Sequence, residues 1–166
     1  ASFREKKGIV DAIEAVSKFS KHREIELTII GDAGSERESQ IEKRRILSAL
    51  ETTGLKERTR LLGYLSYRSM IEESFKHHLF LSPSKTAADG DTEGGAPVTI
   101  VEMLATGIPV VSTTHCDIPE LAGPKLSKFL VREGDCAGLA NQMLRLTDST
   151  EQWREIALAG RNWIEQ

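Results

Sequence analysis

The most informative segment for the architecture is residues 93–113, EGGAPVTIVEMLATGIPVVST, where a glycine-rich turn leads into a helix and then an apolar strand. Pro97 suits the first position of a helix, because its missing N–H would have no partner there. That helix must finish before Gly107 and Pro109. The apolar run 108–111 does not alternate with polar residues, which is typical of a parallel strand covered on both faces. The segment therefore indicates one unit of an α/β fold.

The same alternation of short apolar runs and longer amphipathic segments extends in both directions along the chain. Strands are expected at 24–30, 60–62, 79–81, 108–111 and 128–131. Helices are expected at 9–19, 36–53, 67–76 and 97–106, and again around 139–146 and 153–164. We therefore predict an α/β fold, with a Rossmann-like parallel sheet and helices on both faces.

Composition limits the class of protein. The 166 residues are 39% hydrophobic and 28% charged with a net charge of −3, which fits one folded domain and excludes a disordered chain. This charge gives no general attraction for nucleic acid. No apolar run could span a bilayer, and the charged N-terminus is unlike a signal peptide. Cys116 and Cys136 lack a CxxC pattern, and the histidines lack metal-ligand spacing, so we expect reduced thiols in a cytoplasmic protein.

Residues 82–96, SPSKTAADGDTEGGA, form a long polar stretch between a predicted buried strand and the predicted helix at 97. A loop of this length inside a compact domain is uncommon and usually functional. Ligands of open α/β sheets bind at the carboxyl ends of the strands, so we expect the functional site here.

The end of this loop predicts an anion site. The glycine pair lets a ligand approach the backbone, and the free N–H groups of Val98 and Thr99 at a helix start favour a phosphate. Glu102 lies roughly 7.5 Å further along the helix axis, where it could accept hydrogen bonds from a ribose. From spacing alone, the alternative stays open that Glu93 is an ordinary loop carboxylate and Glu102 a solvated helix residue.

Four segments resemble the C-terminal, donor-binding domain of a GT-B fold glycosyltransferase of the retaining group 1 family (family 4). They are 5–8 with the helix that follows, 28–34 (TIIGDAG), 61–66 (LLGYLS) and 93–113. The resemblance implies that 1–166 is a single nucleotide-sugar-binding domain and that an N-terminal acceptor domain is absent from this chain. It further implies that the full-length protein transfers a glycosyl unit, with retention, in glycan biosynthesis.

The resemblance also implies roles for individual residues. Lys7 corresponds to the lysine that neutralises the departing phosphates, and Glu93 to the glutamate that contacts the donor sugar, so both are implied to be catalytic. Glu102 corresponds to the glutamate that holds the ribose. Tyr64 and Leu65 belong to the segment whose backbone faces the nucleobase. The pyrophosphate would be bound by main-chain groups along Gly94, Gly95, Ala96, Pro97, Val98 and Thr99.

The chain departs from the family pattern at two donor-binding positions. Eight residues separate Glu93 from Glu102 rather than the family's seven, and an extra glycine in the loop could absorb the difference. Ser2 stands where the family has a phosphate-binding arginine. Arg4 is either its substitute or a solvated surface residue.

Other chemistries are not expected. Cys116-Asp117 replaces a glycine pair of the family, and we expect His115 and Cys116 to be structural, with no nucleophile beside a base. Residues 89–91, DGD, resemble a metal-binding DxD motif, but we favour a polar turn. The lysine and helix terminus already supply positive potential, and the resemblance implies metal-independent chemistry. We therefore expect no cofactor and no metal, only the nucleotide-sugar substrate.

The predicted function is electrostatic catalysis of glycosyl transfer, in which Lys7 and helix amides stabilise charge on the leaving nucleoside diphosphate. The expected partners are a nucleotide-diphosphate sugar and the N-terminal domain of the same protein, with no nucleic acid. Any membrane association, at the inner face, would come through missing parts. A nucleotide-binding module without transferase activity remains an alternative. An oxidoreductase is disfavoured, because 31–34 (GDAG) lacks the GxGxxG pattern.

Overall fold

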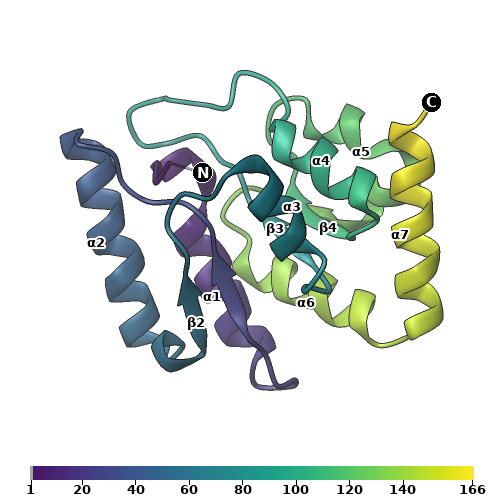
Figure 1. The fold of residues 1–166 in the computed structure, drawn as a ribbon, viewed down its shortest axis with the longest axis horizontal. Helices are drawn as coiled ribbons and strands as arrows, with labels where there is room; N and C mark the ends of the chain where they lie inside the picture. The colour runs from purple at the N-terminus through teal and green to yellow at the C-terminus, as the bar shows by residue number, and fades with distance from the viewer. Residues whose placement is uncertain (1) are drawn as a thin grey trace.

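The computed structural model describes residues 2–166, which have the alternating α/β order expected from the sequence (Figure 1). The strands are β1 (Leu27–Ile29), β2 (Thr59–Leu61), β3 (Phe80–Ser82), β4 (Val110–Thr113) and β5 (Leu130–Val131). The helices are α1 (Ile9–Phe19), α2 (Arg37–Thr52), α3 (Tyr67–Ser74), α4 (Val98–Thr106), α5 (Ile118–Leu126), α6 (Cys136–Thr147) and α7 (Thr150–Ile164). Short 3₁₀ turns are η1 (Glu5–Lys7), η2 (Lys56–Arg58) and η3 (Ser127–Phe129). The predicted α/β class is confirmed, and within residues 2–166 no helix is long and apolar enough to cross a membrane.

The parallel strands pair as two groups rather than as the single sheet predicted. β1 pairs with β2, and β3, β4 and β5 pair in that order. The N-terminal segment joins the groups: the Phe3 amide donates to the Asp32 carbonyl at 2.9 Å, and the Lys85 amide donates to the Lys6 carbonyl at 2.9 Å. These bonds and the Ser2–Asp32 bridge are too few to form a continuous ladder, which explains the division.

Helices cover the strands and close the core. α1 packs against α2 and α6, whereas α7 packs against α4 and α5 (Figure 1). The apolar stripe of α1 is buried as predicted, with Ile13, Val16 and Phe19 in the core. β4 has a neighbour on each side and is buried along its whole length, which accounts for its lack of alternation.

Helix α5 is the main difference from the sequence-based expectation, because no helix was predicted over 118–126. The Gly123-Pro124 pair is typical of a helix break. The structure keeps both residues by kinking the helix at Gly123, where φ is 65° and ψ is 178°. The other difference is small: Pro97 has an extended ψ of 128° and precedes α4, so the predicted first helical position is wrong by one residue.

The kink in α5 is packed against α7. A Cβ added at Gly123 would lie 2.6 Å from ring atoms of Trp163, and the Trp163 indole Nε1–H donates to the Leu121 carbonyl at 3.0 Å. Glycine at 123 is therefore required both by its backbone conformation and by the ring above it.

We expect Gly123→Ala to lower the free energy of unfolding by about 2–4 kcal/mol, from backbone strain plus displacement of Trp163. Gly54→Ala is the matched control, because Gly54 also has a positive φ, 70°, but open space around it. It should cost only about 1 kcal/mol. Urea denaturation measures both, and equal losses would mean that the Trp163 contact contributes nothing.

A second prediction concerns Glu73, which ties α3 to β2. Its carboxylate accepts from Lys76 Nζ at 2.7 Å and from Arg60 Nη1 at 2.8 Å, and these bonds hold the pKa of Glu73 below its ordinary value. A lowered pKa contributes stability that is present above the ordinary value and lost as the pH falls through the lowered one. The stability advantage over Glu73→Gln should therefore be constant near neutral pH and shrink below about pH 4. Thermal unfolding across this range measures it, and a constant difference would contradict the prediction.

Candidate functional site

The structure brings together the two residues that the resemblance marks as catalytic. Lys7, in η1, donates from Nζ to Glu93 Oε2 at 2.8 Å, although 86 positions separate them in the sequence. The Glu93 side chain is only 8% exposed and that of Lys7 is 28% exposed. Ser84 Oγ donates to the other Glu93 oxygen at 3.3 Å. Glu93 is therefore a partly desolvated carboxylate, with Lys7 as its ion-pair partner among residues 2–166. Sequence reasoning did not find Ser84.

Gly8 fixes the position of the turn that carries Lys7. It adopts a left-handed conformation with φ 61° between η1 and α1. A Cβ there would lie 1.9 Å from the carbonyl oxygen of Pro83, which directly follows β3. Only glycine allows the two backbone segments to approach so closely.

A buried histidine supports the backbone of Glu93. The His115 ring, 2% exposed as a residue, accepts at Nε2 from the Glu93 amide at 3.2 Å. Its Nδ1 lies 2.6 Å from Glu133 Oε1, and the other Glu133 oxygen accepts from the Thr86 amide at 2.9 Å. Burial acts to raise the pKa of Glu133, but the Thr86 amide and the His115 ring outweigh it, and the pKa is lowered. Glu133 carried no sequence signal, because it lies beyond the matched motifs.

Cys116 overturns one expectation from the sequence. Its sulfur lies 3.1 Å from His115 Nε2, so a thiol does sit beside a base, contrary to the prediction. Neighbouring side chains of an extended strand point in opposite directions. Cys116 instead has φ 45°, the one positive value at a non-glycine residue in the described chain, and this turn brings Sγ back to the His115 Nε2.

The loop before α4 presents main-chain donors. Within residues 2–166, no hydrogen bond is donated by the amides of Gly95, Ala96, Val98 or Thr99. Val98 is 69% exposed at the first turn of α4, and a Cβ at Gly95 would meet only Asp117 Oδ2, at 3.6 Å. Gly94, with φ 71°, donates to Thr92 Oγ1 at 3.2 Å. Unpaired amides at a helix start can bind an anion, which is the role that the motif predicts for this loop.

Glu102 lies on α4, in the turn after this amide cluster. It is half-buried, and its side chain makes no hydrogen bond or ion pair with any other described residue. The carboxylate is therefore available to a ligand, although the structure itself does not assign it one.

Arg4 forms an ion pair with the DGD turn at residues 89–91. Asp91 accepts from Arg4 Nη2 at 3.2 Å and from Lys6 Nζ at 3.0 Å, and Lys6 also donates to the Thr92 carbonyl at 2.8 Å. The Lys6 hydrogen bond, with the Arg4 charge, lowers the pKa of Asp91. Asp91 thus has a cation on each oxygen, and residues 2–166 contain no cluster of three metal-ligating side chains. Sequence reasoning did not identify Lys6.

The predicted nucleobase segment lies at the ends of β1 and β2. Tyr64 is 59% exposed, and its hydroxyl donates to the Asp32 carbonyl at 2.7 Å. Lys43 Nζ donates to Asp32 Oδ1 at 2.7 Å, and this bond, with the Ala33 amide, lowers the pKa of Asp32. Leu65 is half-buried and follows directly.

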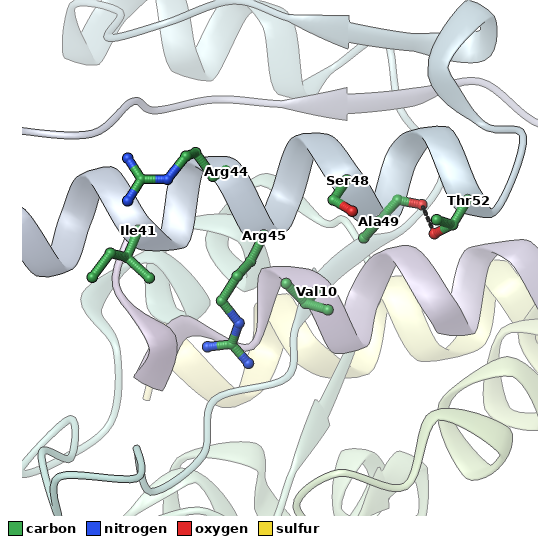
Figure 2. A pocket seen from close by; sticks show the side chains of 7 residues that line it. All are labelled: Val10, Ile41, Arg44, Arg45, Ser48, Ala49 and Thr52. Carbon is green, nitrogen blue, oxygen red and sulfur yellow. Dashed lines mark hydrogen bonds between the residues drawn. The ribbon is translucent and has the colours of Figure 1, made fainter.

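Two surface hollows lie away from this amide cluster. One, of about 450 Å³, lies between α1 and α2, with Val10 of α1 beside Arg45 and Ala49 of α2 (Figure 2). The other, of about 220 Å³, is lined by charged residues that include Arg4 and Asp91. Neither is lined by Glu93 or Glu102.

Comparison with known sequences identifies the family. The family model described as "Glycosyl transferases group 1" matches residues 1–149. The chain is 36% identical over 166 residues to the amylovoran biosynthesis glycosyltransferase AmsK of Erwinia amylovora, covering 99% of this chain and 39% of that protein. It is 33% identical over 169 residues to the putative colanic acid biosynthesis glycosyltransferase WcaL of Escherichia coli K12, with the same coverage, 99% and 39%. The chain spans about two fifths of the length of these relatives.

A solved structure shares the fold. Alr3699/HepE of Anabaena, crystallised in complex with UDP and glucose, has a TM-score of 0.84 at 22% identity, over 100% of this chain and 42% of that one. At this identity the likeness concerns the architecture alone. The family model and the two relatives show the family as well as the fold: this chain belongs to the group 1 glycosyl transferases.

Proposed function

We propose that this chain binds the nucleotide-sugar donor of a glycosyltransferase, with the donor pyrophosphate on the unpaired amides before α4. The observation that carries the proposal is the position of those amides directly after Glu93, the residue whose carboxylate pairs with Lys7. Glu102, which has no partner among residues 2–166, would accept from the ribose hydroxyls. Glu93 would accept from hydroxyls of the sugar.

The proposed catalysis is electrostatic. Lys7 and the amides at the start of α4 would stabilise negative charge on the nucleoside diphosphate as it leaves. Lys7 would supply the stabilising positive charge in place of a metal ion. This is consistent with the ion pairs that both Asp91 oxygens form with Lys6 and Arg4. In the proposal Arg4 remains with Asp91 or turns to the phosphates, and Tyr64 and Leu65 face the nucleobase.

The activity belongs to a longer protein in this proposal. The matched relatives are named biosynthesis glycosyltransferases, and the chain corresponds to 39% of their length. A further, N-terminal domain would hold the acceptor and would lie against the donor site. Retention of configuration and a cytoplasmic location, peripheral to the inner membrane face, are inferred from the family resemblance.

Donor binding can be tested by titration calorimetry of this chain with UDP, GDP and ADP. We expect one of them to bind, and Glu102→Gln to weaken it about 10- to 100-fold, because a hydrogen bond to a charged acceptor contributes about 1.5–3 kcal/mol. Glu57→Gln is the matched control: Glu57 is exposed on η2, before β2 and so at the amino ends of the strands. If no nucleotide binds a folded sample, or Glu102→Gln binds it as tightly as the unchanged chain, the donor site is wrongly assigned.

Lys7→Ala should weaken binding of the same nucleoside diphosphate by about tenfold or more, because a charge-assisted bond to the phosphates is lost. Lys18→Ala, at the far end of α1, removes the same charge without touching the site and should bind normally. Because Lys7→Ala leaves Glu93 without its cation, thermal unfolding without nucleotide must show that the variant is folded. Sugar transfer by the longer protein then separates a transferase from a binding module without activity.

A further inference from the structure

We propose that Cys116, His115 and Glu133 form a reactive thiol site that exchanges with small disulfides. Cys116 is exposed, and its sulfur lies 3.1 Å from Nε2 of the buried His115. Glu133 lies 2.6 Å from the other ring nitrogen. A nucleophile beside a base, with the base oriented by a third group, is the arrangement that activates a thiol.

The hydrogen bonds around the ring assign its roles. Glu133 Oε1 is a carboxylate acceptor at Nδ1, so the ring proton lies on Nδ1 and Nε2 is left as the acceptor. The Glu93 amide, which can only donate, bonds to Nε2 at 3.2 Å and requires the same tautomer. Nε2 can therefore take the proton of the Cys116 thiol, and the Glu133 carboxylate stabilises the imidazolium that results.

The proposed step is thiol–disulfide exchange. Cys116 Sγ attacks one sulfur of a small disulfide R–S–S–R as its proton passes to His115 Nε2. The S–S bond of the reagent breaks, a Cys116–S–S–R bond forms, and the leaving thiolate takes the proton to give R–SH. No other oxidant is needed, since the small disulfide is itself reduced.

The backbone at Cys116 keeps the thiol in place. A positive φ at a residue with a side chain is strained and persists only where the surroundings impose it. Here α5 follows directly, with Asp117 as the residue before its first turn. The strained turn directs Sγ toward His115 Nε2 while leaving Cys116 exposed.

Cys136 provides an internal reference in the same molecule. It is half-buried in α6, and burial, with Asp11 and Glu14 nearby, raises the pKa of its thiol to about 11. It should react slowly, because only the thiolate attacks. The proposal therefore requires Cys116 to react faster than Cys136, but that difference alone does not establish it. Variants of His115 and Glu133 test whether these two side chains activate the Cys116 thiol.

The experiment uses bis(2-hydroxyethyl) disulfide, a neutral reagent whose approach is insensitive to surface charge. Mass spectrometry of the folded chain follows mixed-disulfide formation at each cysteine. We expect Cys116 to react about tenfold faster than Cys136, and His115→Gln and Glu133→Gln to slow Cys116 by about tenfold each. Glu120→Gln, an exposed carboxylate on α5, removes the same charge without touching the ring and should leave the rate unchanged.

The proposal is overturned if Cys116 reacts no faster than Cys136, or if Cys116 keeps its rate in a folded Glu133→Gln variant. Because His115 is buried and His115→Gln could fail to fold, the more exposed Glu133 is the deciding position, with circular dichroism to confirm folding. In urea, where the geometry is lost, the unchanged chain and Glu133→Gln should modify Cys116 at the same rate. A difference that persists in urea would also overturn the proposal.

Discussion

The close approach of Gly8 to the Pro83 carbonyl sets the geometry of the candidate site. A Cβ at Gly8 would stand 1.9 Å from that oxygen, so the η1 turn lies directly on the chain that leaves β3. From this turn the Lys7 side chain reaches Glu93, which lies near the end of the loop that follows β3. Parallel strands all end at the same edge of a sheet, and Gly8 adds the N-terminal turn to that edge.

His115, which follows β4 at this same edge, links Glu93 to the Cys116 thiol. Its Nε2 is shared between the Glu93 amide and the Cys116 sulfur, at 3.2 and 3.1 Å. One lone pair cannot serve both fully, and a protonated Nε2 can accept from neither. Any proton that Cys116 gives to the ring therefore removes the support of the Glu93 backbone. The proposed thiol exchange at Cys116 and the proposed donor binding at Glu93 would therefore compete, because both depend on His115 Nε2.

Most of the fold could be predicted from the sequence, because hydrophobic periodicity directly reflects burial. The β4 run and the α1 stripe are examples of patterns whose core positions the structure confirms. Helix α5 could not, since the local propensity of Gly123-Pro124 opposes a helix, and the tertiary packing that favours it, including that of Gly123 against Trp163, is not visible in the local sequence. Within the site, motif positions indicated Lys7 and Glu93. Glu133 could not be found, because its role arises from a contact with His115 across 18 positions.

The Lys7–Glu93 pair suggests how the proposed donor would enter. A partly buried ion pair is held together in part because separating it leaves a desolvated charge, here on Glu93, whose side chain is 8% exposed. A nucleotide sugar could remove this penalty at both ends. Its pyrophosphate offers Lys7 a new anion, and its hydroxyls offer Glu93 new donors, so both charges stay satisfied. A free phosphate would satisfy only Lys7 and would leave the Glu93 carboxylate with the Ser84 hydroxyl as its remaining side-chain donor. The pair would thus favour a ligand that carries a sugar and a diphosphate together, which is a selection by charge balance rather than by shape.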